Sequence, residues 1–470
     1  MKFNGFTTDA HVHDPAVRKG PDGRYYLFGT HMTSAVSDDL RHFTMLTKEN
    51  VSPSNTLFRG LFETEAFDFC GKFDGKVHAV WAPDVMWFPE RKRWLMYFCT
   101  SGSYVRSSIC LASSENITGP YHFEKVLLSS GFTAETGADK RFYELMGSDA
   151  SVQPYLRKNG SYNNFSWPNC IDPNLTYDRD GRLWMVYGSW SGGIFLLEID
   201  RKTGDIIHPE PDEKHGVDRY FGRHLLGGGH KSHEGPYLVY DSVSDWYYLF
   251  VSFGWLANTG GYQVRLFRSR NVDGPYTDMN GKGFGRVPDH SGYGLKLIGN
   301  HELPGLERGC MAPGHNSVLQ DDDGSLYMVC HQRFEGCGDW HEPRVRQLYR
   351  TADGWLTLSP YQMPGHAEPV TELTADAAEG TWDLLCHGLD ISGEIHRPAA
   401  VICTAAGELT GEDGGRGRLI CAENGWTGLE WQGRSYNGAC FQAENESGER
   451  VLCVSAVGGN ESIWMVKRNG

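Results

Sequence analysis

Four acidic residues and one histidine occupy equivalent places in a pattern that recurs along the first three quarters of the chain. These residues, each at or near the start of one copy of the pattern, are Asp14, Asp84, Asp172, Glu234 and His315. Acidic groups that share one polar channel repel one another, so the pKa of at least one of them rises. Hydrolysis of a glycosidic bond requires such a set, because one carboxylic acid protonates the leaving oxygen while a second carboxylate activates water or attacks. Asp14, Asp172 and Glu234 are therefore candidate catalytic acids.

Other acidic residues of the pattern have a simpler interpretation. Asp22, Asp180 and Asp323 each precede a glycine between two strand-like runs, which is the composition of a tight hairpin turn. Asp84, in the sequence WAPDV, stays open between a place in the channel and a role as an anchor for its strands.

The pattern itself predicts the fold. Its five copies cover residues 13–30, 82–100, 171–189, 234–252 and 312–331. Each copy reads as two antiparallel strands joined by a tight turn, and the second strand is apolar and aromatic. Two copies are followed by a third strand and a Gly-Pro-Tyr sequence. Five such units predict a five-bladed β-propeller, in which the innermost strands begin near a central channel and bring distant residues together.

A different organisation begins near residue 368. Short alternating strands with glycine-rich turns replace the repeat there, and they predict a second domain of ordinary size. The chain is therefore predicted to be all-β, with a five-bladed β-propeller over residues 1–367 and a small C-terminal β-barrel or sandwich over residues 368–470.

Composition limits the partners and the compartment. The net charge of -15 opposes binding to nucleic acid, and no apolar run is long enough to cross a membrane. The 12 cysteines form no CxxC pair, so the usual zinc and redox signatures are missing. The N-terminal residues lack the apolar core of a signal peptide, which predicts a cytoplasmic protein, although a chain with its leader removed would look the same and be secreted.

Five phrases of the repeat carry a resemblance to a known family. They are HDPAV (13–17), WAPDV (81–85), NCIDPNLTYDRDGRLWMVYGSW (169–190), HEGPYL (233–238) and GHNSVL (314–319). Together they resemble glycoside hydrolase family 43 and, within it, the endo-arabinanases, and the last 100 residues resemble the C-terminal β-barrel of the two-domain members. The resemblance implies inverting hydrolysis of α-1,5-L-arabinofuranosidic linkages in arabinan or arabino-oligosaccharides. Asp14 would be the general base, Glu234 the general acid, and Asp172 the residue that orients the acid and holds its pKa.

The same resemblance implies the binding residues. His315 falls where the family binds a cation in the channel, usually Ca²⁺ with a shell largely of water. A neutral imidazole suits transition metals better than calcium, so Na⁺, another cation, or a histidine bonded only to water stay open. Asn169, Ser189 and Trp190 resemble positions that line the arabinose subsite. Trp81 and Trp190 could stack on sugar faces, and Gly102 would let the chain approach the sugar closely.

Two classes of alternative remain. The same scaffold could carry an exo-acting arabinanase, a β-xylosidase or an arabinofuranosidase, and the loops at residues 129–164 and 335–342 could close one end of a cleft. A non-catalytic, glycan-binding propeller would be expected to lack one of the three acids, and all three are present.

Overall fold

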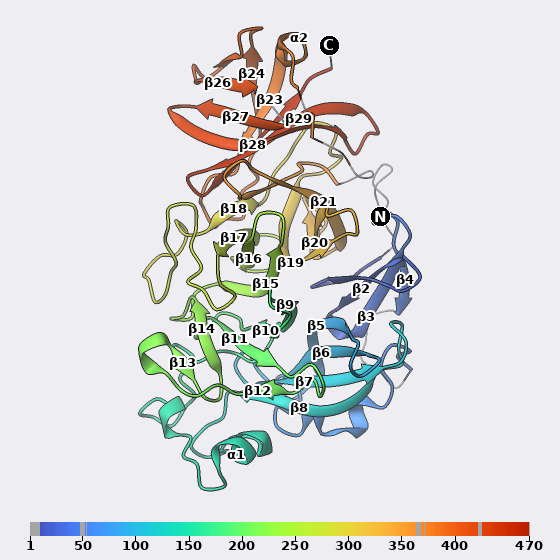
Figure 1. Cartoon of the computed structure of the whole chain (residues 1–470), viewed down its shortest axis with the longest axis vertical. Helices are drawn as coiled ribbons and strands as arrows, with labels where there is room; N and C mark the ends of the chain where they lie inside the picture. Colours follow the sequence, from blue (N-terminus) through green and yellow to red (C-terminus); the bar gives the residue numbers. More distant parts are fainter. Residues whose placement is uncertain are drawn as a thin grey trace.

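The computed structural model describes residues 10–47, 52, 54–362, 367, 369–370, 372–421 and 425–469, and these residues form an almost entirely β structure. Figure 1 shows two parts, with a group of sheets below and a β-barrel above. The predicted all-β fold, a five-bladed propeller with a second β domain, is confirmed. Among the described residues, none of the helices is long and apolar enough to span a membrane.

Five separate sheets form the propeller. The first contains β1 (Ala16–Lys19), β2 (Tyr25–Gly29), β3 (Thr33–Ser37) and β4 (Thr44–Thr47). The second contains β5 (Ala79–Phe88), β6 (Arg93–Ser101), β7 (Ser107–Ser114) and β8 (His122–Ser130). The third contains β9 (Asn174–Tyr177), β10 (Leu183–Tyr187), β11 (Ile194–Ile199), β12 (Ile206–Ile207), β13 (Val217–Asp218) and β14 (Gly222–Leu226). The fourth contains β15 (His233–Asp241), β16 (Trp246–Phe253), β17 (Gln263–Ser269) and β18 (Leu295–Ile298), and the fifth β19 (Cys310–Gln320), β20 (Leu326–Phe334), β21 (His341–Arg350) and β22 (Leu356–Leu358).

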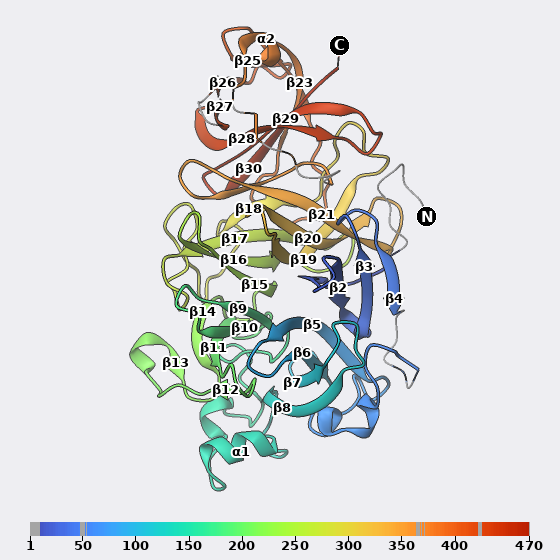
Figure 2. The ribbon, with the colours of Figure 1, turned by 45° about the vertical axis from the view of Figure 1, so that its right-hand side comes forward.

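The innermost strands close a ring. β1 lies against β5 and β19, β5 against β9, β9 against β15, and β15 against β19. Figure 2 shows the labelled members of this set nearest the common centre of the five sheets. Each repeat copy thus supplies the two inner strands of one blade, as predicted, and the start of every copy faces the same channel.

The hairpin turns form as the sequence predicts. Gly23, Gly181 and Gly324 have φ values of 79°, 77° and 83°, which glycine adopts without the clash that a Cβ would cause. The third strands predicted after two copies are β7 and β17. The inserted segment at residues 129–164 contains α1 (Lys140–Met146), whose N-terminus is capped by the Asp139 carboxylate accepting a hydrogen bond from Phe142 N at 3.0 Å.

The second domain is a closed barrel rather than a sandwich. Its strands are β23 (Gly380–Cys386), β24 (Ala399–Cys403), β25 (Glu408–Gly411), β26 (Arg416–Cys421), β27 (Trp426–Trp431), β28 (Arg434–Glu444), β29 (Arg450–Gly458) and β30 (Glu461–Lys467), preceded by α2 (Ala375–Ala378). The predicted boundary between residues 367 and 368 lies between β22 and β23, and residue 368 is outside the described residues.

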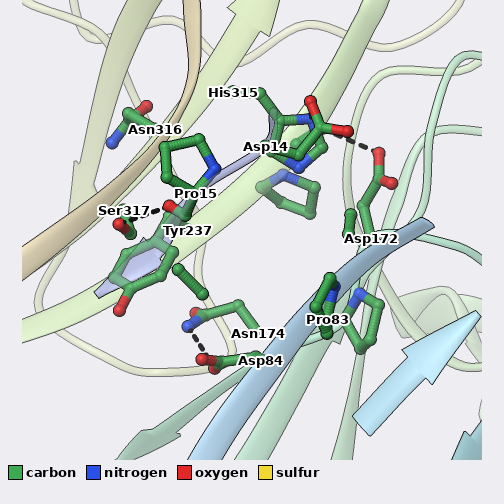
Figure 3. Close-up of a pocket in the computed structure, with 15 residues that line it drawn as sticks. Asp14, Pro15, Pro83, Asp84, Asp172, Asn174, Tyr237, His315, Asn316 and Ser317 are labelled. Carbon is green, nitrogen blue, oxygen red and sulfur yellow. Dashed lines mark hydrogen bonds and ion pairs between the residues drawn. The ribbon is translucent and has the colours of Figure 1, made fainter. Parts of the chain in front are cut away.

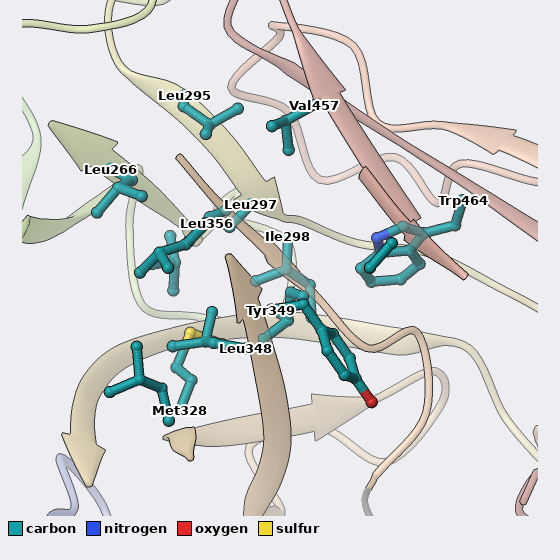
Figure 4. Packing of buried hydrophobic residues seen from close by; sticks show 14 of the residues in the cluster. Leu266, Leu295, Leu297, Ile298, Met328, Leu348, Tyr349, Leu356, Val457 and Trp464 are labelled. Carbon is teal, nitrogen blue, oxygen red and sulfur yellow. The ribbon is translucent and has the colours of Figure 1, made fainter. Parts of the chain in front are cut away.

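The barrel packs directly on the fourth and fifth blades. Leu297 and Met328 of the propeller share one buried apolar cluster with Val457 and Trp464 of the barrel (Figure 4). A buried ion pair joins Arg344 of β21 to Glu446 at 3.0 Å. The two parts therefore form a continuous core, which supports the blades next to the site described below.

Candidate active site

The functional side chains stand where the innermost strands begin, and the backbone is irregular there. Asp14, Asp172 and His315 have φ values of 54°, 58° and 47°, a region that non-glycine residues rarely adopt. Register shifts follow Glu234 in β15 and flank Gly314 in β19. Bulges of this kind redirect side chains at the rims of sheets, and strained backbone is concentrated at functional sites. Here they turn the side chains toward the channel.

The three candidate acids line one cleft of about 690 Å³, a size typical of ligand sites. The other predicted residues that line it are Asn169, Ser189, Trp190, Trp81 and His315. None of residues 129–164, all of them described, lines this cleft, whereas His341 at the end of the 335–342 loop does. The loop at residues 129–164 therefore does not form part of the wall of the cleft.

Asp14 is held as a carboxylate by a hydroxyl and three imidazoles. Thr30 Oγ1 donates a hydrogen bond to Asp14 Oδ2 at 2.5 Å and accepts one from the backbone of blade 2. The Nδ1 atoms of His13, His315 and His331 lie 2.8, 3.1 and 3.5 Å from Asp14 Oδ1. Burial alone would raise the pKa of Asp14, but the neighbouring His13 and His315 and the hydrogen bond from His13 hold it well below its usual value.

Glu234 has the opposite tendency. Burial raises its pKa, and the negative charge of Asp14 adds to this effect, while His315 and two hydrogen bonds work against it. Tyr262 donates its hydroxyl proton to Glu234 Oε1 at 2.8 Å, and the Trp190 indole donates to Oε2 at 2.8 Å. Ser189 Oγ lies 3.4 Å from the same Oε2. Each oxygen of this carboxyl group is thereby fixed in place.

Asp172, like Glu234, has a raised pKa. Burial, together with the charges of Glu234 and Asp14, raises the pKa of Asp172 to about 7, although His315 and a hydrogen bond from Gly235 N at 3.1 Å lower it. The charge of Glu234 thus acts on Asp172, whereas the charge that adds to burial in raising the pKa of Glu234 is that of Asp14. Figure 3 shows the carboxyl groups of Asp14 and Asp172 turned toward one another beside His315.

Asp84 is an anchor and not part of the cleft. Its two oxygens accept a bidentate pair of hydrogen bonds from Arg18, both at 2.7 Å. It also accepts from Val85 N at 2.9 Å, Leu175 N at 2.8 Å and Asn174 Nδ2 at 3.0 Å. These contacts tie together the first three blades at the closed end of the channel, where Figure 3 shows Asp84 beside Asn174.

Aromatic side chains form two walls of the cleft. On one side Phe73 contacts both Trp81 and Tyr104 edge to face, with ring centroids 5.2 Å apart in each pair. On the other side Trp190 and Trp255 lie 6.0 Å apart. Tyr104 is 63% and Trp255 45% exposed, so both walls offer ring surface to a ligand.

Two predicted subsite residues have a different local role. Asn169 donates from Nδ2 to the Tyr104 carbonyl at 3.0 Å, so it also holds the exposed Tyr104 in place. Gly102 does not line the cleft. A Cβ at Gly102 would lie 1.8 Å from the carbonyl oxygen of Cys70, so this glycine permits close packing of two chain segments.

His315 is the only predicted metal ligand, and its surroundings limit what it could hold. Its ring lies flat on Gly235, where a Cβ would come within 3.0 Å of His315 Cγ. The cavity beneath it, toward Asp84, measures about 20 Å³, which is room for roughly one water. Ca²⁺ takes six to eight oxygen ligands, so an ion here would face the open cleft, near the carboxylates of Asp14 and Asp172. The residues present fit a cation that keeps most of its water shell.

Several site residues were missed by the sequence reasoning, although a signal existed. Thr30, Ser252 and His331 stand at or just after the second strand in three copies of the repeat, as the predicted Ser189 does in a fourth. Thr30 and His331 contact Asp14, and Ser252 Oγ accepts a hydrogen bond from His315 N at 2.7 Å. A polar residue ending an apolar strand in each copy was therefore a usable sign. Tyr262 lies outside the repeated positions and had no such sign.

Comparisons with known proteins agree with this arrangement. The profile of glycosyl hydrolases family 43 matches residues 130–356. The chain is 35% identical over 468 residues to the extracellular endo-alpha-(1->5)-L-arabinanase 2 of Bacillus subtilis, covering 94% of this chain and 92% of the relative. It is 36% identical over 419 residues to the extracellular endo-alpha-(1->5)-L-arabinanase of Thermotoga petrophila, covering 86% and 82%. The crystal structure of an endo-1,5-alpha-L-arabinanase from Thermotoga petrophila RKU-1 superposes with a TM-score of 0.83 at 30% identity, covering 100% of this chain and 99% of that one.

Proposed function

Because this chain belongs to glycosyl hydrolase family 43, we propose that it is an inverting glycosidase that cleaves α-1,5-L-arabinofuranosidic linkages within arabinan or arabino-oligosaccharides. The linkage and the endo mode follow the names of the Bacillus subtilis and Thermotoga petrophila relatives. The observation that carries the chemistry is the opposite direction in which the protein moves the pKa values of Asp14 and Glu234 within one cleft. One group stays an acceptor of protons while the other stays a donor.

The two acids divide the reaction between them. Asp14 accepts a proton from a water molecule while the water oxygen forms a bond to the anomeric carbon. The bond from that carbon to the glycosidic oxygen breaks, and Glu234 gives its proton to the departing oxygen. The configuration at the anomeric carbon is inverted. At the end Asp14 is protonated and Glu234 is ionised, and exchange with solvent restores both.

Asp172 acts through Glu234. A second carboxyl group close to the acid disfavours loss of the acid's proton, which keeps Glu234 a donor near neutral pH. The charge of Glu234 raises the pKa of Asp172, and this interaction between the two groups supports the assignment. Trp190, Ser189 and Tyr262 fix the orientation of Glu234, and Trp81 and Trp190 offer faces on which sugar rings could stack.

The proposal includes a cation at His315, with Ca²⁺ as the first candidate and Na⁺ or another ion as alternatives. When bound, the ion supplies positive charge near Asp14 that favours the ionised base. Calcium should raise the melting temperature of chelated protein, and His315→Ala should abolish that rise. Turnover and melting temperature that are both unchanged after exhaustive chelation would exclude a functional divalent ion and leave His315 as a hydrogen-bonding residue.

Product analysis tests the activity. Debranched linear arabinan should yield a series of oligosaccharides early in the reaction, and aryl xylosides should be poor substrates. Arabinose as the sole early product would replace the endo mode by an exo mode. Activity only on aryl xylosides would favour the β-xylosidase alternative, and no activity on any substrate would favour a glycan-binding propeller.

The compartment is part of the same proposal. Both relatives are named extracellular. The proposal is that this chain is also extracellular, in place of the cytoplasmic location predicted from its first residues. Fractionation of producing cells, with detection by antibody, checks it. Enzyme confined to the cytoplasm would overturn the extension and restrict the substrate to imported oligosaccharides.

A further inference from the structure

We propose that His13, Asp14 and His331 form a site for a divalent transition metal such as Zn²⁺, and that metal bound there blocks the base. The proposed inhibition rests on the proposed function, because it assigns Asp14 as the base. The binding of metal does not depend on that assignment. The site lies on the side of Asp14 formed by the first and fifth blades, and it does not include His315.

The geometry suits a metal with nitrogen and oxygen ligands. His13 Nδ1 lies 2.8 Å and His331 Nδ1 3.5 Å from Asp14 Oδ1, and one ligand atom from each of the three residues lies within 4.8 Å of the others. The two imidazoles are stacked, with centroids 4.0 Å apart and planes at 19°. Zinc bonds of about 2.0–2.2 Å in a tetrahedron put neighbouring ligand atoms roughly 3.3 Å apart. One imidazole must rotate out of the stack to bring the three groups to that spacing and to direct both nitrogen lone pairs at one ion.

Neither proton position of His331 satisfies all the groups around its ring. The ring is fully buried, and its Nε2 has no partner. Its Nδ1 faces two groups, the Asp14 backbone N–H at 3.3 Å and the Asp14 carboxylate at 3.5 Å. If Nδ1 accepts from the N–H, its lone pair faces a carboxylate oxygen. If Nδ1 carries the proton instead, the N–H loses its acceptor. A metal between Nδ1 and Oδ1 removes the repulsion of the first arrangement, and because Nδ1 has a single lone pair, the Asp14 N–H then gives up this acceptor.

Access and selectivity follow from the surroundings. His13 and Asp14 both line the open cleft, with 18% and 11% of their side chains exposed, so an ion can enter from solvent. Two imidazoles and one carboxylate suit Zn²⁺, Ni²⁺ and Cu²⁺, whereas Ca²⁺ and Mg²⁺ prefer oxygen ligands. A fourth position would face the cleft and hold water. The site should therefore discriminate against the cation proposed at His315.

The effect on the reaction is inhibition. The metal would use the Asp14 oxygen that must accept the proton of the attacking water, while Thr30 continues to bind the other oxygen. A chelator should restore activity.

Titration of the chelated full-length protein with ZnCl₂ in a calorimeter tests the site directly. One equivalent should bind, and His331→Gln should weaken binding by at least about tenfold, since even residues that only support a ligand cost about 10–100-fold when replaced. His208→Gln is the matched control, because His208 is a partly buried histidine that contacts Arg219 O and Tyr220, not Asp14. His13→Gln provides a second ligand variant if His331→Gln fails to fold. Absence of binding, or binding unchanged in both ligand variants, would overturn the proposal.

Inhibition is measured separately on arabinan. The zinc concentration that halves the rate should match the dissociation constant from calorimetry, and Ca²⁺ should not inhibit. If zinc binds more weakly to the ligand variants, as expected, but does not change the rate of the parent enzyme, the metal site would stand and the proposal that the metal blocks Asp14 would be refuted. An enzyme inactive on every glycoside would refute the proposed function and leave the binding result standing.

Discussion

Tyr262 offers a sharp test of how the proton donor is tuned. Its hydroxyl donates a hydrogen bond to Glu234 Oε1 at 2.8 Å, and this bond favours the ionised carboxylate. Tyr262→Phe removes the bond while keeping the ring, which packs on Gly314 and stacks with His331 at 5.7 Å. Hydrogen bonds to charged groups contribute about 1.5–3 kcal/mol, and one pKa unit corresponds to about 1.4 kcal/mol. The pKa of Glu234 should therefore rise by about one to two units.

The pH profile of kcat/KM on arabinan measures this shift. Activity falls on the alkaline side as the donor loses its proton, so a higher pKa moves that limb to higher pH. Tyr248→Phe is the matched control, since it deletes a hydroxyl that donates to Gly354 O at 2.7 Å, outside the cleft. Its profile should equal that of the parent. An alkaline limb that stays in place, or moves to lower pH, in Tyr262→Phe would refute the assignment of Glu234 as the donor.

Three further predictions concern the base, the modulator and the domain interface. Thr30→Val deletes a hydrogen bond to ionised Asp14, so the pKa of Asp14 should rise and the acid limb of the kcat/KM profile should move to higher pH by about one unit. Thr30→Ser should keep the acid limb at the pH of the parent, and an acid limb that does not move in Thr30→Val would argue against Asp14 as the base. Asp172→Asn removes the carboxyl group that we propose keeps Glu234 protonated. The alkaline limb should therefore move to lower pH with a loss of rate of about 10²-fold or more, and a limb that moves to higher pH would contradict the role of Asp172. His301 packs against Trp464 of the barrel, and burial lowers its pKa to about 3. Between pH 6.5 and about 3 the unfolded chain therefore binds a proton that the native protein does not. As the pH is lowered through that window, this residue alone should therefore reduce the free energy of unfolding by about 1.4 kcal/mol per pH unit. Denaturant unfolding at a series of pH values should show that the free energy of unfolding of His301→Gln depends on pH less steeply by that amount. An equal pH dependence in parent and variant would exclude the effect.

The sequence predicted the fold because its determinants are local and repeated. Each hairpin carries its own turn residues, such as Asp22-Gly23, and its own apolar second strand, and five copies leave few alternatives to a ring of blades. The closure of the second domain was harder to predict. Alternating strands fit both a barrel and a sandwich, and only the pairing of β23 with β30 decides between them.

The site was predictable in part for the same reason. Asp14, Asp172, Glu234 and His315 hold equivalent positions in the repeat, so the propeller brings them together. Asp84 holds such a position too, but Arg18 satisfies both of its oxygens, and no local pattern announces a pairing between blades. Gly102 was predicted to lie close to the sugar because a glycine indicates close approach, but the sequence does not show which group approaches it. Tyr262 reaches Glu234 from outside the repeat, so only the folded structure reveals it.

The division of roles between Asp14 and Glu234 is tested most directly by the leaving-group dependence of Glu234→Ala. The rates of parent and variant are compared on linear arabinan and on an aryl arabinofuranoside whose leaving group departs with little protonation. General acid catalysis contributes about 10²–10⁴-fold, so the variant should lose activity on arabinan by about that factor and much less on the aryl substrate. Hydrolysis of arabinan by Glu234→Ala at nearly the parent rate would contradict the assignment of Glu234 as the proton donor.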